Sequence, residues 1–239
     1  MEAGDVHLWL ARPDGIADPG LLTAYRDLLS PAERERLDAI RLGPRRREQL
    51  LTRALVRTVL SRYGAARPSE WRFAPGPHGR PELDPPAAIR FNLSNSPGLV
   101  GCAVARGAVG LDLEPAARAG RILRLAARVF SLGERRALGA LPEGERADRA
   151  LSLWTLKEAY LKARGLGISV PLGEITFSLD APAGIGLSLG PGLGDDPRRW
   201  HFSLLDHAGH RLALCADLPP RLAAWETTPL LPGSDLRLR

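Results

Sequence analysis

The chain has 239 residues and a formal net charge of +6, with 44% hydrophobic and 25% charged residues. No apolar run approaches the length of a membrane span, and the first residues lack the basic and apolar segments of a signal peptide. Two cysteines without metal-binding spacing favour a reducing compartment, so we expect a cytoplasmic protein. The positive charge favours an anionic partner, either nucleic acid, a phosphorylated small molecule or an acidic protein.

The first half of the chain combines one long helix with short strands. Alternating residues predict a strand over 6–11, and two short helices follow within 18–40, the second capped by Ser30 and started by Pro31. Apolar residues at helical spacing predict a helix over 45–63 that ends before a glycine. Residues 71–83 predict a strand that runs into a Gly/Pro loop, and three short strands separated by turn residues are predicted at 88–96, 98–107 and 108–115.

The second half also combines a principal helical region with short strands. A helical region over 121–165, interrupted near 139–145, comes first. Strands are then predicted at 174–180, 185–190, 199–206 and 210–218. Helices and strands that cluster in this way indicate an α+β fold rather than alternating βαβ units.

Two acidic residues lie on the strand predicted at 108–115. Asp112 and Glu114 are two positions apart, so both carboxylates project from the same face of the strand. Adjacent carboxylates repel each other unless water or a cation lies between them. The alternative is an exposed strand face with two solvated acids.

Lys157 and Lys162 are the only lysines in the chain, since the other 31 basic residues are arginines. On the predicted helix, Glu158 and Lys162 form an i, i+4 pair. A surface ion pair would not require lysine rather than arginine, whereas a site that needs a compact ammonium group would require it. Lys157 has either a role in such a site or a structural role.

Asp112, Glu114 and Glu158 together would make an oxygen-only cluster. Such a cluster suits Mg²⁺, which keeps waters and substrate phosphates as its other ligands. The sequence contains no Walker loop and no dinucleotide-binding glycine motif. The phosphate would therefore be held by some other basic surface.

The segment "VGLDLEP" (109–115) is followed about forty residues later by "WTLKEAYLKARGLGI" (154–168). This pair of segments resembles the signature of the 4′-phosphopantetheinyl transferases, in the larger, monomeric, two-lobed Sfp form. Further segments also resemble that family: "LSPAERERL" (29–37), "GRP" (79–81), "FNLSNS" (91–96), "FSLGE" (130–134) and "GLGISVPL" (165–172).

The resemblance implies an enzyme that transfers 4′-phosphopantetheine from coenzyme A to a serine of an apo carrier protein and releases 3′,5′-ADP. It implies that Asp112, Glu114 and Glu158 hold Mg²⁺, with Mn²⁺ as an alternative. It assigns Glu158, or a water that Glu158 polarises, as the catalytic base, and Lys162 as the group that contacts phosphate in the transition state. Glu134 would be either an acid near the site or a first-turn charge of a helix.

Coenzyme A also carries a 3′-phosphate, so several cations are expected around it. We expect Arg53 and Arg80, and then Arg45, to contact its phosphates, with Ser94 and Asn95 beside them. The family usually has His at the position of Asn95, and Asn donates a hydrogen bond without charge or proton relay. The alternative is that the helix arginines only solubilise an exposed face.

The resemblance divides the chain into a coenzyme A-binding lobe (1–110), a lobe with the metal and the catalytic helix (111–225) and a loosely held tail (226–239). It implies two pseudo-symmetric lobes, each a long helix packed on a small antiparallel sheet. The expected partners are coenzyme A and acidic acyl or peptidyl carrier proteins of fatty-acid, polyketide or nonribosomal peptide synthesis. The enzyme would act as a monomer.

Two other classes of function stay open. A basic nucleic-acid-binding protein is disfavoured because the arginines are spread through the chain and no nucleic-acid-reading motif accompanies them. A non-catalytic coenzyme A or carrier-protein binding module is supported by Asn95 and opposed by the intact acidic residues with Lys162. We therefore expect neither a nucleic acid nor a membrane as partner.

Overall fold

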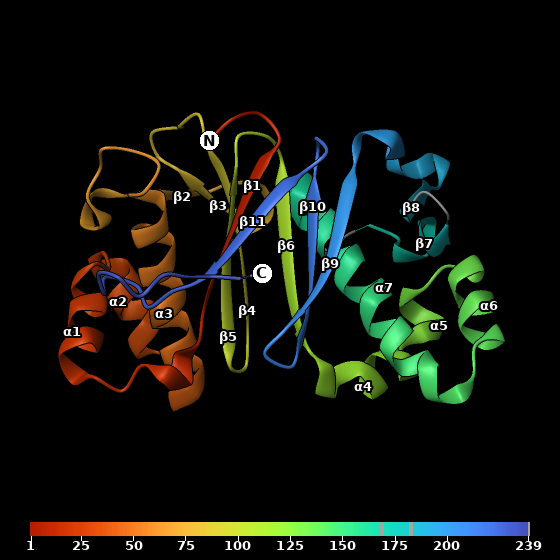
Figure 1. Cartoon of the computed structure of the whole chain (residues 1–239), viewed down its shortest axis with the longest axis horizontal. Coiled ribbons are helices and arrows are strands. Elements are labelled where there is room, and N and C mark those ends of the chain that lie inside the picture. The colour runs from red at the N-terminus through yellow and green to blue at the C-terminus, as the bar shows by residue number, and fades with distance from the viewer. Residues whose placement is uncertain (168–169, 182–183, 239) are drawn as a thin grey trace. The chain divides into compact units, whose positions relative to one another are not determined.

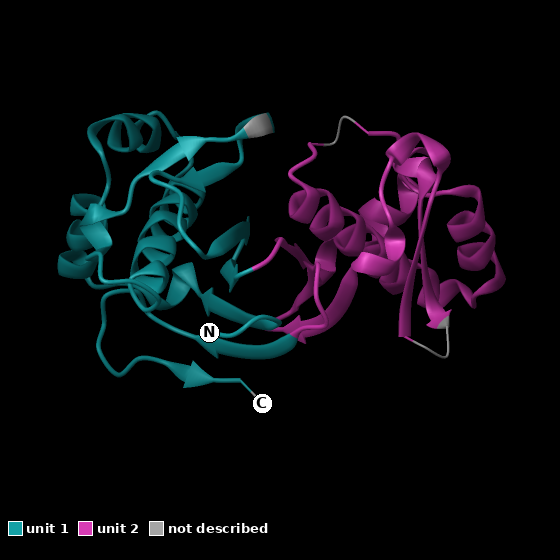
Figure 2. Cartoon of the chain, turned by 90° about the horizontal axis from the view of Figure 1, so that it is seen from above, with its two compact units in different colours: residues 1–106, 221–239 teal, residues 107–220 magenta. Residues whose placement is uncertain are grey.

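The computed structural model describes residues 1–167, 170–181 and 184–238. The chain divides into two compact units, coloured separately in Figure 2. Unit 1 comprises residues 1–106 and 221–239, and unit 2 comprises residues 107–220. In the sequence, unit 2 is therefore an insertion into unit 1.

This division differs from the predicted one at both boundaries. The predicted boundary after residue 110 falls inside strand β6 (Val109–Pro115), all of which pairs with β10 (His210–Ala216) of unit 2. The predicted tail belongs to unit 1, because β11 (Arg221–Glu226) pairs in parallel with β1 (Asp5–Ala11). The sequence analysis did not predict β11.

Unit 1 is built on a five-stranded sheet with the order β12-β11-β1-β5-β4. β5 (Leu99–Ala105) pairs antiparallel with both β1 and β4 (Arg90–Ser96). β12 (Leu236–Arg237) pairs antiparallel with β11. The sheet is mixed rather than purely antiparallel, because β1 and β11 pair in parallel. A parallel pair needs a long connection, and the connection between these two strands includes all of unit 2.

Helix α3 (Gly43–Leu60) packs on this sheet, with α1 (Pro19–Asp27) and α2 (Pro31–Asp38) beside it (Figure 1). It begins two residues before the predicted helix and ends three residues earlier. As predicted, Ser30 caps α2. A two-stranded ribbon, β2 (Phe73–Pro75) with β3 (Pro81–Leu83), completes the unit. Buried apolar residues of α3 and β5 form much of its core: Leu51, Ala54, Leu55, Val59, Val100, Cys102 and Val104.

Unit 2 contains the antiparallel sheet β6-β10-β9, whose edge strand β9 covers His201–His207. Helix α7 (Glu143–Arg164) packs along β6 and β10 (Figure 1). Gly110 of β6 permits this approach, because a Cβ atom at that position would overlap the carbonyl oxygen of Ala159 in α7. The backbones of strand and helix thus lie in direct contact beside Asp112.

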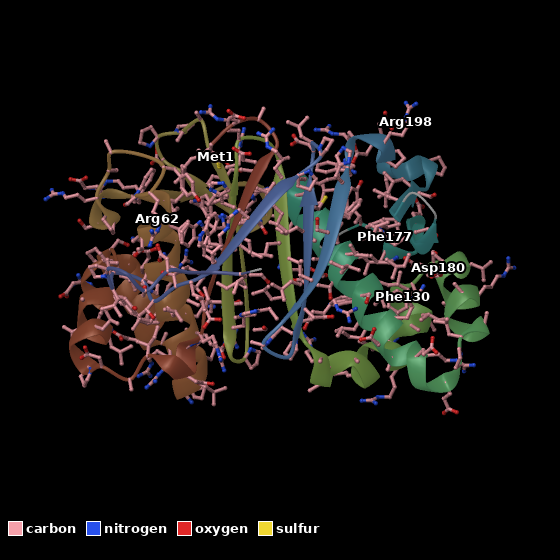
Figure 3. All side chains as sticks on the ribbon, viewed as in Figure 1. Met1, Arg62, Phe130, Phe177, Asp180 and Arg198 are labelled. Atoms are coloured by element: carbon pink, nitrogen blue, oxygen red, sulfur yellow. The ribbon has the colours of Figure 1, made fainter. Side chains whose placement is uncertain are left out.

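The rest of unit 2 covers the other side of α7. The predicted helical region is broken at 141–142, as expected, and also before that point, giving α4 (Ala119–Arg124), α5 (Ala126–Val129) and α6 (Leu132–Ala140). Strands β7 (Ile175–Ala181) and β8 (Gly184–Leu189) form a separate ribbon. Phe130 and Phe177, labelled in Figure 3, belong to the core that these elements share with α7.

The predicted α+β fold class is confirmed, since each unit contains one long helix packed on a sheet. Single-turn 3-10 helices connect these elements, at 13–15, 68–70, 77–79, 116–118, 172–174, 191–193 and 197–199. In the part of the chain that the structure describes, no helix is both long and apolar enough to cross a membrane.

Candidate active site

The three predicted carboxylates come together in unit 2. Asp112 and Glu114 lie on β6, and both are buried. Glu158 lies on α7, and burial together with the negative charge of Asp112 raises its pKa to about 7, with a further contribution from Glu114. Among the residues that the structure describes, its buried Oε1 atom has no hydrogen-bond partner. We call Asp112, Glu114 and Glu158 the acidic cluster.

Lys162 contacts the acidic cluster from the same helix as Glu158. Its Nζ atom lies 2.6 Å from Oδ1 of Asp112 and donates a second hydrogen bond, of 3.0 Å, to the carbonyl oxygen of Leu111. The Lys162 side chain is 28% exposed, so its ammonium group is at the edge of the buried cluster. The lysine predicted to act at the site therefore lies against the predicted carboxylates.

Glu114 has two further partners that the sequence analysis missed. Nη1 of Arg118 lies 2.7 Å and 2.5 Å from its two carboxylate oxygens, and Nε1 of Trp154 donates to Oε1 at 2.9 Å. Burial and the charge of Asp112 raise the pKa of Glu114 in spite of these partners. The sequence could have indicated Trp154, because it precedes Glu158 by four residues and therefore lies on the same face of α7.

The acidic cluster offers only carboxylate oxygens to a divalent cation. Within the described ranges, no group of three or more His, Cys, Asp or Glu side chains is arranged so that it could hold a metal ion. The donor set nevertheless suits Mg²⁺, because it consists of carboxylate oxygens and includes the unpartnered Oε1 of Glu158. The cationic groups of Lys162 and Arg118 partly neutralise the negative charge of Asp112 and Glu114, which a metal ion would also neutralise.

Lys157 is enclosed in the core of unit 2, where its contacts link neighbouring elements. Its side chain is completely buried and lies 2.8 Å from Oε2 of Glu134. It also donates hydrogen bonds to the carbonyl oxygens of Leu172, at 2.8 Å, and of Ile175. Glu134 is the third residue of α6 and completes a capping box with Ser131, so it has the first-turn role that was one of its two predicted alternatives.

In unit 1, Arg53 and the "GRP" turn meet at one pocket of about 580 Å³. Gly79 and Pro81 of the turn line this pocket, together with Arg53. The pocket has a basic lining that also includes Arg36, Arg57 and Arg72, while Glu33 and two aspartates line it too. Glu33 forms an ion pair of 2.6 Å with the buried Arg57 and lies 3.8 Å from Nε of Arg53.

The other predicted phosphate contacts lie elsewhere in unit 1. Arg80 lines a smaller pocket of about 200 Å³ and donates to the carbonyl oxygen of Phe91 at 3.1 Å. Arg45 is exposed in the first turn of α3, and Ser94 and Asn95 lie on β4, where Ser94 is buried and Asn95 exposed. Among the described residues, these three line neither pocket.

The segment after α7 resembled the family at "GLGISVPL" (165–172). Gly165 has a left-handed backbone (φ 68°) and caps the C-terminus of α7, a conformation that favours glycine. Residues 168 and 169 of this segment lie outside the described residues.

Comparison with known proteins assigns the family. A family model described as the 4′-phosphopantetheinyl transferase superfamily matches residues 108–215. The 4′-phosphopantetheinyl transferase HetI of Nostoc sp. is 32% identical over 225 residues, which cover 83% of this chain and 92% of HetI. The chain belongs to the 4′-phosphopantetheinyl transferase superfamily. The predicted family and enzyme class are therefore confirmed.

Two further proteins are similar to parts of this chain. The 4′-phosphopantetheinyl transferase Sfp of Bacillus subtilis is 28% identical over 196 residues, covering 82% of this chain and 85% of Sfp. Among solved structures, the holo-[acyl-carrier-protein] synthase of Neisseria meningitidis is similar with a TM-score of 0.39 and 23% identity, over 45% of this chain and 94% of the synthase.

Proposed function

We propose that this member of the superfamily transfers 4′-phosphopantetheine from coenzyme A to a serine hydroxyl of an apo acyl or peptidyl carrier protein. The observation that carries this proposal is the acidic cluster with Lys162 against it, in the part of the chain that the family model matches. The names of the relatives HetI and Sfp support the same reaction.

We propose that unit 1 binds the nucleotide end of coenzyme A. Its basic pocket at Arg53 and the "GRP" turn offers guanidinium groups, which bind phosphate through paired hydrogen bonds. Arg80, Arg45, Ser94 and Asn95 are proposed to add further phosphate contacts. Asn95 can donate a hydrogen bond there but supplies no charge.

The proposed chemistry is an in-line displacement at the phosphorus that bears the pantetheine arm. The serine oxygen forms a bond to this phosphorus while the bond to the bridging oxygen breaks, so that 3′,5′-ADP leaves. The serine proton passes to Glu158, directly or through a water. In the metal-free protein the pKa of Glu158 is raised to about 7, so its carboxylate can accept a proton near neutral pH.

Mg²⁺ bound by Asp112, Glu114 and Glu158 would supply charge neutralisation for the pyrophosphate oxygens. Lys162 is proposed to contact a phosphate oxygen and to neutralise charge that develops in the transition state. Its side chain is 28% exposed, and its ammonium group lies 2.6 Å from Oδ1 of Asp112. Trp154 is proposed to hold Glu114 in position.

The proposed partner is an acidic carrier protein, and the proposed acting species is a monomer. The formal charge of +6 would attract an acidic partner and speed the encounter with it. This contribution would fall with increasing salt concentration.

Intact-protein mass spectrometry of several apo carrier proteins after incubation with coenzyme A and Mg²⁺ tests the proposal. We expect a phosphopantetheine mass increase with the wild type, none with EDTA and none with Glu158→Gln. Arg53→Ala and Arg80→Ala should raise the KM for coenzyme A, whereas Arg135→Ala, an exposed arginine of α6, should not. Coenzyme A binding without modification of any carrier would instead favour the non-catalytic binding module.

A further inference from the structure

Two of the three carboxylates in the acidic cluster are paired with a cation of the chain itself. Lys162 pairs with Asp112, and Arg118 pairs with Glu114. Lys162 already has a proposed role in the reaction. Arg118 has none, although its Nη1 atom lies within 2.7 Å of both oxygens of the Glu114 carboxylate.

The position of Arg118 suits a cation that can leave. It follows Glu114 by four residues, in the single-turn helix at 116–118 directly after β6. Its side chain is 44% exposed, whereas that of Glu114 is 7% exposed. Because the side chain of Arg118 is half-exposed, the guanidinium group can turn into solvent while the carboxylate stays in place. The cation that displaces it then takes over the compensation of the buried charge of Glu114.

The remaining partner of Glu114 keeps the carboxylate oriented after such a movement. Nε1 of Trp154 donates to Oε1, whereas Arg118 contacts both Oε1 and Oε2. Withdrawal of Arg118 would expose Oε2 while the bond from Trp154 still fixes Oε1. A metal ion that binds Glu114 needs a lone pair on one of these oxygens, and a guanidinium cation beside it would also repel a divalent ion.

We propose that Arg118 is an internal counter-ion of Glu114 in the metal-free protein. Its guanidinium group competes with the metal for the Glu114 carboxylate and is displaced when the metal binds. This inference rests on the proposed metal site of the transferase. It makes Arg118 a determinant of metal affinity that does not itself take part in the chemical step.

The test is Mn²⁺ binding to the full-length chain, followed through the electron paramagnetic resonance signal of free Mn²⁺, with no coenzyme A and no carrier protein. We expect Arg118→Gln to bind Mn²⁺ about 3- to 10-fold more tightly than the wild type, because a competing cation is removed. Arg118→Lys, which keeps a positive charge, should lie between the two. Arg128→Gln removes an exposed arginine of α5 and should bind as the wild type does.

Equal or weaker Mn²⁺ binding by Arg118→Gln would overturn the inference, and weaker binding would show that Arg118 orients Glu114 for the metal. Mn²⁺ binding by Arg118→Gln but not by the wild type would support it strongly. Absence of binding by both proteins would overturn it as well. The carrier-modification assay is run on the wild type in parallel. Modification of a carrier would show that the transferase reaction occurs even if Arg118 does not compete with the metal. No modification would show that the proposed reaction has failed as well.

Discussion

Lys157 and Glu134 form an ion pair of 2.8 Å in which both side chains are completely buried. The ammonium group has three donors and meets three acceptors, namely Glu134 and the carbonyl oxygens of Leu172 and Ile175. Glu134 in turn accepts a hydrogen bond from the backbone N–H of Phe177 at 2.9 Å. One lysine therefore joins α7 to the start of α6 and to the start of β7. A planar guanidinium group could not match this compact arrangement, which explains why the chain keeps a lysine here.

Lys157→Met should destabilise the protein by about 3–5 kcal/mol, because it leaves the carboxylate of Glu134 buried without its counter-charge. Urea unfolding followed by circular dichroism measures this loss. The double variant Lys157→Met/Glu134→Gln should be more stable than the single variant, since the isolated charge is gone. A loss below about 1 kcal/mol for Lys157→Met would show that the pair contributes no more than a surface pair.

Gly110→Ala should separate β6 from α7 and abolish transfer activity. The added Cβ would overlap backbone atoms of Ala159 and Ala163, which cannot move aside as a flexible side chain could. Because Asp112 follows on the same strand and Glu158 lies on the same helix, the acidic cluster would lose its geometry. Gly144→Ala is the matched control: it lies in the first turn of α7 and an added Cβ meets nothing within 4 Å.

The control should stabilise the protein slightly, by up to about 1 kcal/mol, since alanine favours a helix more than glycine does. Thermal unfolding and the mass-spectrometric transfer assay provide the two measurements. Full activity in Gly110→Ala would mean that the close contact of strand and helix does not position the carboxylates.

Glu158→Gln should stabilise the protein at pH 8 but hardly at pH 5. The pKa of Glu158 is raised from 4.5 to about 7 by burial and by Asp112. The folded state therefore binds this proton more tightly than the unfolded state, and stability falls as the pH rises from about 4.5 through 7. Glutamine resembles the protonated form and lacks this loss.

Thermal unfolding in EDTA at the two pH values measures the difference between wild type and variant. Glu145→Gln, which removes an exposed carboxylate from the same helix, is the control. Added Mg²⁺ at pH 8 should raise the Tm of the wild type more than that of Glu158→Gln. If the gap between wild type and Glu158→Gln were the same at both pH values, burial of Glu158 would not affect its ionisation.

Tyr25→Phe should loosen the C-terminal segment of unit 1. The buried hydroxyl of Tyr25 donates to the carbonyl oxygen of Pro229 at 2.7 Å, and its loss leaves that oxygen unsatisfied at a cost of about 1–3 kcal/mol. Hydrogen exchange should accelerate at the amide of Thr227, which donates to the carbonyl oxygen of Leu10.

Arg62, labelled in Figure 3, forms a partly exposed ion pair with Asp235 and provides the control. Arg62→Ala should lower the free energy of unfolding by about 1 kcal/mol or less. Unchanged exchange in Tyr25→Phe would contradict this role of the hydroxyl.

The sequence was sufficient to predict which side chains of the acidic cluster share a face. The two-residue period of a strand places Asp112 and Glu114 together, and the four-residue spacing of a helix places Glu158 with Lys162. What brings the two pairs together is the contact between β6 and α7 at Gly110, which local periodicity does not encode. The sequence analysis combined the two segments on the chemistry of an oxygen-only cluster, and the resemblance to a family supported that combination.

The different roles of the two lysines could not be predicted from composition. Five residues along an α-helix turn the side chain by about 140°, so Lys157 and Lys162 face different surroundings. Only the packing shows that one faces the core of unit 2 and the other the acidic cluster. Strand β11 was missed for a similar reason: its partner β1 lies at the other end of the chain, and Arg221 pairs with Asp5.

The insertion of unit 2 into unit 1 has a consequence for biosynthesis. Strand β1 leaves the ribosome early, but its parallel partner β11 is made only after every strand of unit 2. We expect unit 2 to fold without β11, while one edge of β1 stays unpaired, as limited proteolysis of a released chain that ends at residue 220 would show. An unpaired strand edge readily joins other chains. A chain that lacks β11 should therefore be more prone to aggregate than the full chain.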